Sequence, residues 1–475
     1  MEFTVGSGVR RSCAPTVIIL AAGQGTRMRS DLPKVLHVVG GKPLLAHVID
    51  TAIQLEARRV CVVYGHGGER VRASLAHLPV TWVEQASQLG TGHAVLQALP
   101  HLQHGDTALI LYGDVPLIRP ETLRTLLDAV VPSPDAPKGA LALLTVDLLD
   151  PTGYGRILRD EAGQVIGIVE EKDATPRERQ VREVNTGVLA VDGGYLANWI
   201  ARLDTRNAQG EYYLTDIVSL AVADGVPVRT TAPSVLIEVL GVNQRVQLAE
   251  LERAYQLCRA RELMLQGVTL RDPARFDLRG ELTVGRDVEI DIGVIFEGQV
   301  QLGDRVRIGP HCFLKDVTIA DDTEVRAHSV LEGATVGQGC VIGPFARLRP
   351  GTTLDSRVHV GNFVEIKQSQ VQEGSKINHL SYIGDADVGR GVNVGAGTIT
   401  CNYDGANKHR TVIGDRVFVG SNTALVAPVE IGADAIIGAG SVIVCNAPSG
   451  ELTLSRARQE TRPGWKRPTK KASTA

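Results

Sequence analysis

Hydrophobic residues form short runs through the first half of the chain, and longer stretches with helical patterns separate them. The runs lie at 17–20 (VIIL), 60–65 (VCVVYG), 108–114 (ALILYGD), 140–146 (ALALLTV) and 185–191 (NTGVLAV). Aliphatic runs of this length predict buried strands, and helices between them predict crossover connections. Residues 16–242 are therefore expected to form an α/β domain with a mostly parallel sheet.

In the second half, aliphatic residues recur at every sixth position. One series is Val336, Ile342, Leu348, Leu354, Val360 and Ile366, and another is Ile413, Val419, Leu425, Ile431, Ile437 and Ile443. The spacing shortens to five between Leu314 and Ile319 and between Leu331 and Val336. This periodicity predicts a parallel β-helix with three hexapeptides per coil and the aliphatic side chains directed inward. Its narrow core leaves little space for rings, which agrees with an aromatic content of 4%.

Between these regions, residues 243–267 carry apolar positions at helical spacing amid charges, at Leu248, Leu251, Tyr255 and Cys258. They predict an amphipathic helix that either links the two domains or belongs to only one of them. We expect an N-terminal extension over 1–15, the β-helix over 268–455 and a basic tail over 456–475. The tail either contacts a neighbouring molecule or is a solvated end.

Composition narrows the class of protein. A chain of 475 residues exceeds one hydrophobic core, and 43% hydrophobic residues with a net charge of -3 exclude disorder and a nucleic-acid partner. Seven cysteines, without CxxC pairs, indicate free thiols in a reducing compartment.

The apolar run after Arg10 and Arg11 is too short for an export signal, and no segment has the roughly 18 apolar residues of a membrane helix. We expect a soluble, cytoplasmic protein.

The loop LAAGQGTRMRSDLPK (20–34) directly follows the first predicted strand. Its glycines permit close approach of a phosphate, and a helix start offers unpaired N–H groups. The dinucleotide pattern GxGxxG fails at its third glycine, where Met28 stands, and no GxxxxGK[ST] occurs. Arg27 and Lys34 supply enough positive charge to face a triphosphate. A tight turn with solvated cations is the alternative.

Further polar segments follow the other predicted strands, at the sheet edge where α/β proteins bind ligands. QLGTGHA (88–94) is a small turn suited to a flat base, and LYGDVPL (111–117) contains Asp114 at the end of a strand. A carboxylate there can hold a hard cation that bridges phosphates, although a turn aspartate remains possible. The series continues with TGYGRI (152–157), IVEEKDAT (168–175), EVNTGV (183–188) and IEVLGVN (237–243).

The hexapeptide period is interrupted by a polar loop, TITCNYDGANKHR (398–410), which the coil does not need. Such loops often carry function. His379 lies near Tyr382, with Lys367 and Arg349 one and two coils earlier. Because histidine titrates near neutral pH, His379 is a candidate proton acceptor. A β-helix alone, however, can also be a scaffold.

The ordered motifs of the first half, LAAGxGTRM with Pro33-Lys34, GTGHA, YGDVPL, GYGRI, VEEKDAT, NTG and GVN, resemble the uridylyltransferase half of the bacterial bifunctional GlmU family. The resemblance implies a Rossmann-like fold and transfer of UMP from UTP to N-acetylglucosamine 1-phosphate. It implies Mg²⁺ on Asp114 and Asn243. The implied nucleotide and sugar contacts are Leu20, Ala21, Ala22, Gly23, Arg27, Lys34, Gln85, Gly90, Thr91, Tyr112, Gly113, Asp114, Gly155, Glu170, Asn185 and Asn243, of which Gly155, Glu170 and Asn185 hold the sugar phosphate.

In the second half, PFARLRPG, GNFVEIK, NVGAGTITCNYDG and VFVGSN resemble the acetyltransferase half of the same family. The resemblance implies a left-handed parallel β-helix, acetyl transfer from acetyl-CoA to glucosamine 1-phosphate, and His379 as base. Asn378 stands where the family commonly has a small residue. The implied sugar-phosphate contacts are Arg349, Lys367, Tyr382 and Asn393, and the implied acetyl-CoA contacts are Ala396, Asn402, Tyr403, Ser421, Ala439 and Arg456.

The sequence therefore predicts a bifunctional enzyme of UDP-N-acetylglucosamine synthesis, in which acetylation comes first. Small molecules are its expected substrates, and the family resemblance implies a homotrimer, with neither nucleic acid nor membrane as a partner. One alternative is a nucleotidyltransferase of other specificity with a non-catalytic β-helix. Another is a non-catalytic sensor of sugar nucleotides.

Overall fold

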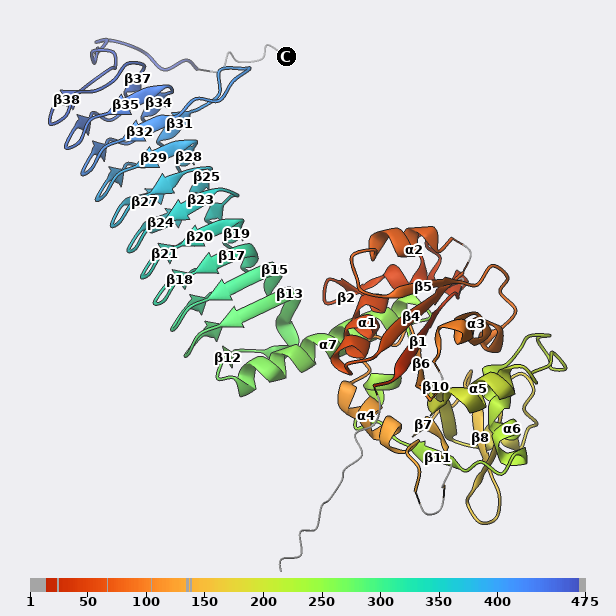
Figure 1. The fold of residues 1–475 in the computed structure, drawn as a ribbon. Helices are drawn as coiled ribbons and strands as arrows, with labels where there is room; N and C mark the ends of the chain where they lie inside the picture. The colour runs from red at the N-terminus through yellow and green to blue at the C-terminus, as the bar shows by residue number, and fades with distance from the viewer. Residues whose placement is uncertain are drawn as a thin grey trace, which may run out of the picture. The chain divides into compact units, whose positions relative to one another are not determined.

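The structure is a computed structural model that describes residues 14–469, except for 24, 66, 104, 134, 135, 137 and 138. The chain forms two compact units, Met1–Cys258 and Arg259–Ala475, and each is described by itself (Figure 1). The expected extension at 1–15 lies outside the described residues apart from 14 and 15, as does the end of the expected tail from 470 onward. Within the described ranges, no helix combines the length and apolar character needed to cross a membrane.

The N-terminal unit is built on a nine-stranded sheet whose main path runs β11-β7-β10-β6-β1-β4-β5. Strand β1 pairs in parallel with β4 and β6, whereas β10 pairs antiparallel with β6 and β7. All five aliphatic runs form strands of this sheet, which confirms the α/β domain. The sheet is mixed rather than mostly parallel, because four of its eight strand pairings are parallel and four are antiparallel. The strands are β1 (Thr16–Ala21), β4 (Arg59–Tyr64), β5 (Thr81–Glu84), β6 (Thr107–Tyr112), β7 (Leu141–Asp147), β8 (Arg156–Arg159), β9 (Val165–Val169), β10 (Glu183–Asp192) and β11 (Val228–Thr231), with a separate pair β2 (Val38–Val39) and β3 (Lys42–Pro43).

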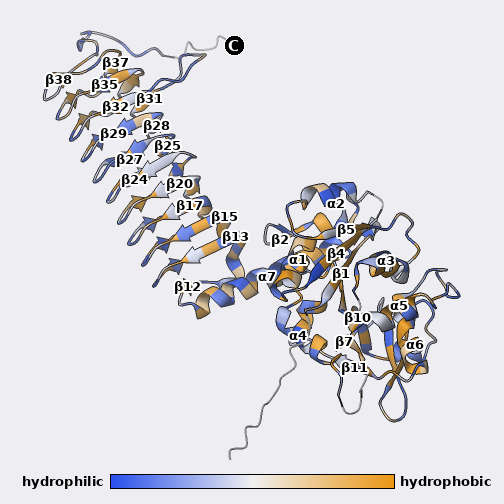
Figure 2. Cartoon of the chain, viewed as in Figure 1, coloured by the Kyte–Doolittle hydropathy of each residue, from blue (hydrophilic) through white to orange (hydrophobic). Residues whose placement is uncertain are grey.

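Helices cover both faces of this sheet. They are α1 (Leu44–Gln54), α2 (Glu69–Ser74), α3 (Thr91–Ala98), α4 (Pro120–Asp128), α5 (Gly193–Ile200) and α6 (Ile217–Ala223). Side chains of a strand alternate between its faces. Accordingly, Val17 and Ile19 of β1 join one apolar cluster with α1 and α4, whereas Ile18 and Leu20 join the other with α3, α5 and α6. Figure 2 marks the central strands as hydrophobic.

The second unit is a parallel β-helix with three rows of short strands. One row is an eleven-stranded sheet, β12-β14-β16-β18-β21-β24-β27-β30-β33-β36-β38, and the other two rows form a single sixteen-stranded sheet that is continuous through β17. The first row comprises β12 (Thr269–Leu270), β14 (Glu289–Ile290), β16 (Arg307–Ile308), β18 (Glu324–Val325), β21 (Val341–Ile342), β24 (His359–Asn362), β27 (Lys376–His379), β30 (Asn393–Val394), β33 (Phe418–Val419), β36 (Ile436–Ile437) and β38 (Leu452–Thr453).

The sixteen-stranded sheet begins with long strands and continues as two rows. The long strands are β13 (Phe276–Val284), β15 (Val294–Leu302) and β17 (Phe313–Ile319). One row then holds β19 (Val330–Glu332), β22 (Arg347–Leu348), β25 (Glu365–Lys367), β28 (Tyr382–Gly384), β31 (Ile399–Cys401), β34 (Ala424–Val426) and β37 (Val442–Ile443). The other holds β20 (Ala334–Val336), β23 (Thr352–Leu354), β26 (Gln370–Val371), β29 (Ala386–Val388), β32 (Thr411–Ile413) and β35 (Val429–Ile431).

The predicted aliphatic series fills the core of the β-helix. Every residue of both series is at most 2% exposed, and equivalent positions stack coil on coil, as Ile342 does on Val360. The fold class predicted from the sequence, an α/β nucleotidyltransferase domain with a left-handed parallel β-helix, is confirmed. The expectation about rings needs one refinement, because Phe276 and Phe296 are both buried in the first coils, with ring centroids 5.9 Å apart.

Helix α7 (Arg245–Leu265) lies where the sequence predicts an amphipathic helix. Leu251 packs in an apolar cluster of the N-terminal unit, whereas Ala260 and Leu263 belong to the core of the β-helix. The helix therefore contributes to both units rather than to one. The six cysteines among the described residues are free, as expected.

One predicted boundary is corrected by the structure. The interrupting loop was expected to begin at Thr398, but Thr398 and Thr400 are fully buried and β31 continues the coil to Cys401. The hydroxyl of Thr400 accepts the N–H of Gly384 in the preceding coil, which explains why a polar residue is tolerated inside. The loop proper runs from 402 to 410.

Candidate functional site

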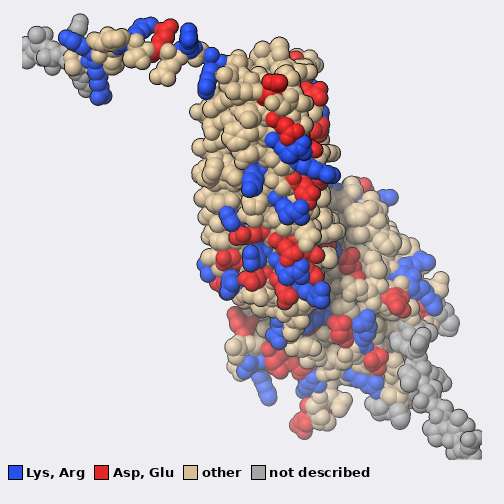
Figure 3. Space-filling model, turned by 90° about the vertical axis from the view of Figure 1, so that its left-hand side faces the viewer, with Lys and Arg blue, Asp and Glu red and all other residues tan. Residues whose placement is uncertain are grey.

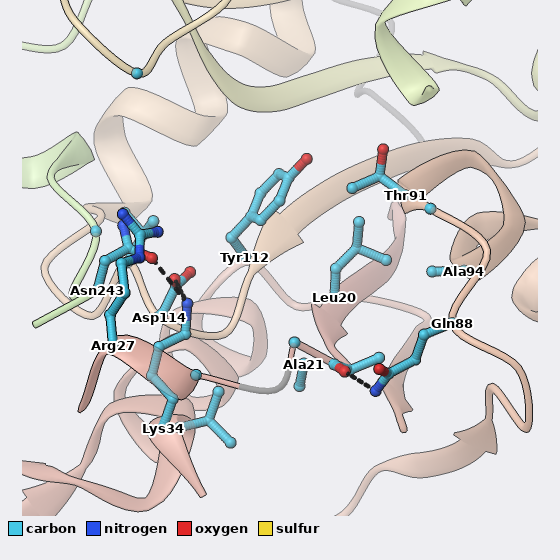
Figure 4. A pocket seen from close by; sticks show the side chains of 18 of the residues that line it. Leu20, Ala21, Arg27, Lys34, Gln88, Thr91, Ala94, Tyr112, Asp114 and Asn243 are labelled. Carbon is cyan, nitrogen blue, oxygen red and sulfur yellow. Dashed lines mark hydrogen bonds and ion pairs between the residues drawn. The ribbon is translucent and has the colours of Figure 1, made fainter. Parts of the chain in front are cut away.

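A cavity of about 900 Å³ opens in the N-terminal unit, beyond the carboxyl ends of β1 and β6. Both the glycine loop and Asp114 reach it (Figure 4). Its wall includes most of the residues implied by the family resemblance: Leu20, Ala21, Ala22, Gly23, Arg27, Lys34, Gln85, Gly90, Thr91, Tyr112, Asp114 and Asn243. The structure therefore gathers segments that are far apart in sequence at the predicted edge of the sheet.

The glycine loop is folded tightly against Lys34. Gly25 has a φ of 63°, and a Cβ on it would lie 2.7 Å from the Cβ of Lys34. Only glycine fits such a position without displacing its neighbour. By contrast, a Cβ on Gly23 would meet nothing within 4 Å, so the space beside it is open to a ligand.

Three charged or polar side chains converge at one end of the cavity. The ammonium of Lys34 lies 2.5 Å from Asp114 Oδ2 and 3.2 Å from Asn243 Oδ1. Both charged side chains are largely buried, with 13% and 14% exposed, and Arg27 points toward the same group in Figure 4. The two oxygens thus face a single cationic position.

At the other end of the cavity, a turn is held in place by glutamine side chains. Gln85 is buried, and its amide donates to the carbonyl of Gly90 at 3.1 Å. Gly90 has a φ of 109°, and a Cβ there would lie 2.6 Å from the carbonyl oxygen of Tyr212. Gln88 donates to the carbonyl of Ala22 at 2.6 Å and so ties this turn to the glycine loop. Sequence reasoning did not single out Gln88, although it begins the quoted segment QLGTGHA.

Four predicted residues do not line the cavity: Gly113, Gly155, Glu170 and Asn185. Instead the adjacent wall is formed by Thr152, Gly153, Tyr154, Thr186, Gln209 and Glu211, which sequence reasoning did not assign. Glu170 accepts a hydrogen bond from the Thr215 hydroxyl at 2.9 Å, and burial raises its pKa. Burial, followed by the charges of Glu170 and Asp114, likewise raises the pKa of Tyr112. The roles proposed for Gly113, Gly155, Glu170 and Asn185 remain predictions.

In the β-helix, the predicted phosphate-binding residues share one row of strands. Glu365 and Tyr382 are paired in register, and Lys367 is paired with Gly384. Arg349 donates to Glu365 at 2.8 Å. These residues line neither the cavity of the N-terminal unit nor a smaller hollow of about 250 Å³ over the first coils, where acidic and basic side chains gather (Figure 3). The side chains of Arg349 and Glu365 are 36% and 32% exposed.

His379 ends β27 and is exposed. Its Nδ1 lies 3.1 Å from Oδ1 of Asn362, the residue with which it is paired one coil earlier. An amide oxygen can only accept, so this contact favours the tautomer that has its proton on Nδ1 and a free lone pair on Nε2. Asn362 was not predicted, but its spacing of one coil from His379 could have indicated it.

The loop from 402 to 410 folds back on itself. Asp404 accepts the backbone N–H groups of Ala406 and Asn407, and His409 lies 2.7 Å from the same carboxylate. Tyr403, 61% exposed, donates to the carbonyl of Gly405 at 2.6 Å. The loop is therefore ordered by its own hydrogen bonds.

The loop also contacts the row of predicted phosphate-binding residues. The amide of Asn402 donates to Asp385 and lies 3.4 Å from the Tyr382 hydroxyl. Lys408 reaches Lys367, whose neighbouring ammonium lowers the pKa of Lys408. The Asp385 carboxylate opposes this shift. Lys408 and Asp385 were not predicted.

The predicted acetyl-CoA residues form a row across successive coils. The carbonyl of Ala396 accepts the N–H of Asn422, and the carbonyl of Ser421 accepts the N–H of Gly440. Arg456 donates to the carbonyl of Ala439 at 2.7 Å. On the neighbouring strand β30, Asn393 pairs with Phe418. The row thus follows the direction in which the coils stack.

Family comparisons match both units. The MobA-like NTP transferase domain family matches residues 17–168. The GMPPB C-terminal domain family matches residues 278–354, and the bacterial transferase hexapeptide family, with six repeats, matches residues 410–445. The first match covers the glycine loop and Asp114, and the last begins at the end of the 402–410 loop.

Curated relatives match the chain from end to end. A protein named bifunctional protein GlmU from Methylococcus capsulatus is 62% identical over 95% of this chain and 97% of its own length. Proteins of the same name from Aromatoleum aromaticum and Stutzerimonas stutzeri are 61% and 59% identical, each over 96% of this chain and 99% of its own length. At this identity and coverage, the chain belongs to the family of bifunctional GlmU proteins.

Proposed function

We propose that the chain makes UDP-N-acetylglucosamine in two steps, with one active site in each unit. The β-helix transfers an acetyl group from acetyl-CoA to glucosamine 1-phosphate, and the N-terminal unit then transfers UMP from UTP to the product. The observation that carries this proposal is the convergence of Lys34, Asp114 and Asn243 in a cavity of a chain that belongs to the GlmU family.

In the second step, a phosphate oxygen of N-acetylglucosamine 1-phosphate attacks the α-phosphorus of UTP. The bond between the α-phosphorus and the oxygen that bridges the α- and β-phosphates breaks, and pyrophosphate leaves. Because the attacking oxygen is already ionised near neutral pH, this step needs positioning and charge neutralisation rather than a general base. Lys34 and Arg27 supply positive charge, and the small residues of the glycine loop let the triphosphate approach the backbone.

The remaining contacts divide between the two ends of the cavity. The uracil of the nucleotide lies against the turn held by Gln85, and its ribose and phosphates follow the glycine loop. The residues proposed to contact the nucleotide are Leu20, Ala21, Ala22, Gly23, Gln85, Gly90 and Thr91. The sugar phosphate is held on the side of Tyr112; the residues proposed here are Tyr112, Gly113, Gly155, Glu170 and Asn185. Only membership in the family supports selectivity for uracil.

The donor set at Lys34 suits Mg²⁺. Carboxylate and amide oxygens are ligands that Mg²⁺ accepts, and it commonly binds through one or two protein oxygens together with phosphates and water. Asp114 and Asn243 offer two such oxygens, which would hold Mg²⁺; in the structure both contact the Lys34 ammonium. Bound there, Mg²⁺ neutralises charge on the phosphates.

In the first step, the amine of glucosamine 1-phosphate attacks the thioester carbonyl of acetyl-CoA. A C–N bond forms, the C–S bond breaks, and CoA leaves as its thiolate. His379 takes the amine proton on Nε2, because its Nδ1 is turned toward Asn362. Arg349 and Lys367 bind the sugar phosphate, and Lys408 joins them because it adjoins Lys367.

The row across the last coils binds acetyl-CoA in this proposal, through Ala396, Asn402, Tyr403, Ser421, Ala439 and Arg456. Tyr382 and Asn393 contact the sugar. Asn402 connects the two groups because it lies 3.4 Å from the Tyr382 hydroxyl. The thioester and the amine would therefore meet near the start of the 402–410 loop.

A homotrimer completes the acetyl-transfer site in this proposal. An exposed ladder runs along one corner of the β-helix, in which the rings of His311, His328, Phe345 and Phe363 stack at 4.9 to 5.3 Å. Phe345, Phe363 and Leu380 are 48%, 56% and 62% exposed, and Leu380 directly follows His379. Apolar surface of this kind marks an interaction site, and a second copy of the chain is the occupant we propose. We also propose a cytoplasmic location.

The test supplies glucosamine 1-phosphate, acetyl-CoA and UTP to the purified chain and follows free thiol and pyrophosphate separately. Both products are expected, and the uridylyl step should accept N-acetylglucosamine 1-phosphate but not the unacetylated sugar at a comparable rate. Pyrophosphate without thiol would support a nucleotidyltransferase with a non-catalytic β-helix. A mixture of UTP, dTTP and ATP then measures base selectivity in one reaction.

A further inference from the structure

A buried arginine lies beneath the loop that forms the sugar side of the cavity. Arg156, the first residue of β8, is 2% exposed. Its guanidinium lies 2.6 Å from Glu171 Oε2 and donates to the carbonyl of Tyr154. A third, longer contact reaches the carbonyl of Arg179 at 3.5 Å, and Nε has no partner among the described residues.

Glu171 holds the same loop from its other side. Its Oε2 accepts the backbone N–H of Gly153 at 3.2 Å, in addition to the contact with Arg156. Arg156, followed by Gly153, lowers the pKa of Glu171, so the carboxylate is ionised at neutral pH. The Arg156–Glu171 bracket therefore fixes a peptide N–H and a peptide carbonyl of the segment 153–154.

That segment faces the cavity. Thr152, Gly153 and Tyr154 all line it, and the next residue, Gly155, is closely packed. A Cβ on Gly155 would lie 2.9 Å from Ile168, and its carbonyl accepts the N–H of Asn185 at 2.8 Å. A displacement of the loop would therefore move the wall against which the sugar is proposed to lie.

Stability alone does not account for this pair. The Arg156 side chain is 2% exposed and the Glu171 side chain 30%, so the guanidinium carries most of the desolvation cost, and an apolar residue of similar volume often stabilises a protein as well or better. What a guanidinium provides instead is several N–H donors fixed in one plane. Here Nη1 contacts both the Glu171 carboxylate and the loop carbonyl of Tyr154, and Nη2 makes the longer contact to the Arg179 carbonyl.

We propose that Arg156 and Glu171 are positioning residues for the sugar phosphate. They act through the segment 152–155 and contact neither the nucleotide nor the reacting atoms. This inference rests on the proposed function, because it assigns the sugar to this side of the cavity. It extends that function to two residues whose side chains do not line the cavity.

The experiment compares R156M, R156K and E171Q with wild type in uridylyl transfer. We expect the KM for N-acetylglucosamine 1-phosphate to rise roughly 10- to 100-fold in R156M, since small displacements of binding groups have effects of this size. The KM for UTP should change less than about threefold, because the loop does not hold the nucleotide. R156K should recover part of the loss, since an ammonium can also donate to the Glu171 carboxylate and the Tyr154 carbonyl, which both contact Nη1 in the wild type.

R159M is the matched control. Arg159 lies on the same strand and is paired with Glu183, but its side chain is 33% exposed and it has no contact with the loop. Acetyl transfer by each variant reports on the β-helix, and thermal unfolding reports on the fold. A purely structural role would lower kcat and the melting temperature in R156M and leave the KM for the sugar unchanged, which would overturn the proposal.

If R156M gives no folded protein, E171Q still tests the proposal, because glutamine retains the volume of glutamate and one oxygen that accepts hydrogen bonds. The R156M/E171Q double variant should be no worse than the more impaired single variant, since both changes open the same bracket. Additive losses would contradict the proposal. If wild type forms no UDP-sugar, the proposed function fails; if wild type is active and R156M and E171Q keep its KM, only this inference fails.

Discussion

The two candidate sites differ in how much of the site one chain provides. In the N-terminal unit, Lys34 and Asp114 lie in a cavity with 13% and 14% of their side chains exposed. In the β-helix, the Arg349 side chain is 36% exposed and Tyr403 is 61% exposed. One set of residues lines a cavity of its own unit, whereas the other is more exposed to solvent.

The difference agrees with the two chemistries. Uridylyl transfer depends on neutralising phosphate charge, and an enclosed site of low dielectric constant strengthens such interactions. Acetyl transfer depends on a base and an aligned thioester, which can be placed on a stiff surface. The coils supply that stiffness because His379 and Asn362 are held in register by adjacent strands. A neighbouring copy would then provide the missing wall.

The largest expected effect separates the two sites by removing the base. His379→Ala should lower the rate of acetyl transfer roughly 10²- to 10⁴-fold, the range attributed to general base catalysis. Uridylyl transfer by the same protein should be unchanged, since His379 belongs to the other unit. Thiol release from acetyl-CoA and pyrophosphate release from UTP measure the two rates.

His359→Ala is the control for this variant, because His359 lies in β24 on the coil before His379. It should retain both activities. Full acetyl transfer by H379A would refute the assignment of the base.

The reciprocal change tests the enclosed site. Asp114→Asn keeps the shape of the side chain but removes the charge beside Lys34, and it should lower uridylyl transfer roughly 10²- to 10³-fold. Removal of Mg²⁺ with a chelator should abolish the wild-type reaction and leave acetyl transfer intact. Asp128→Asn, at the end of α4, serves as the control. Loss of both activities in a folded D114N protein would defeat the separation of the sites.

An intermediate effect is expected at the ladder. Phe363→Glu places charges on the exposed apolar corner and should dissociate the oligomer, with acetyl transfer reduced about tenfold or more because the site loses its second wall. Uridylyl transfer should remain near wild type, since its cavity is formed within one unit. Light scattering measures the mass of the particle. A monomeric wild type that acetylates at full rate would contradict this prediction.

The regular parts of both units could be predicted from the sequence. Short aliphatic runs in the first half and an aliphatic period of six in the second specify which side chains are buried, and Ile18, Ile342 and Ile437 are all buried accordingly. Asp114 could also be placed, because it follows a strand of the sheet and such strand ends meet at one edge. The role of Asn243, which follows no strand, was implied by the family resemblance alone.

The loops could not be placed in the same way, since no period governs them. Gln88 reaches Ala22 across 66 residues because both turns fold over the same edge of the sheet. Lys408 comes to lie beside Lys367 because the 402–410 loop closes on Asp404. Contacts of this kind depend on the tertiary fold, so the order of residues alone does not predict which loop side chains meet.

The smallest expected effect contrasts the pH response of the two units. Burial, with the nearby carboxylates Asp204, Glu170 and Asp173, raises the pKa of Asp216 from 3.8 to about 6. In the β-helix, the Arg305 guanidinium instead lowers the pKa of Asp322 to about 2.

A raised pKa in the folded state stabilises the protonated form, so the contribution of Asp216 is fully present below pH 3.8 and is lost as the pH rises through about 6. The contribution of Asp322 is present above 3.8 and is lost as the pH falls through about 2, so it is constant between pH 5 and 7.5.

Asp216 should therefore contribute about 1 kcal/mol more to the unfolding free energy of the N-terminal unit at pH 5 than at pH 7.5, the pKa shift being discounted for partial exposure. The difference between wild type and Asp216→Asn measures this contribution, because burial lowers the pKa of His37 and His47 in both proteins and their opposing effect cancels. Trp82 and buried Trp199 report on the N-terminal unit, whereas Trp465 is already 69% exposed, so urea unfolding followed by tryptophan fluorescence isolates that unit. Asp224→Asn is the control. Asp224 lies just beyond the same helix, and Arg202 and Trp199 lower the pKa of its carboxyl group instead of raising it. A D216N protein with the wild-type slope would contradict a raised pKa at Asp216.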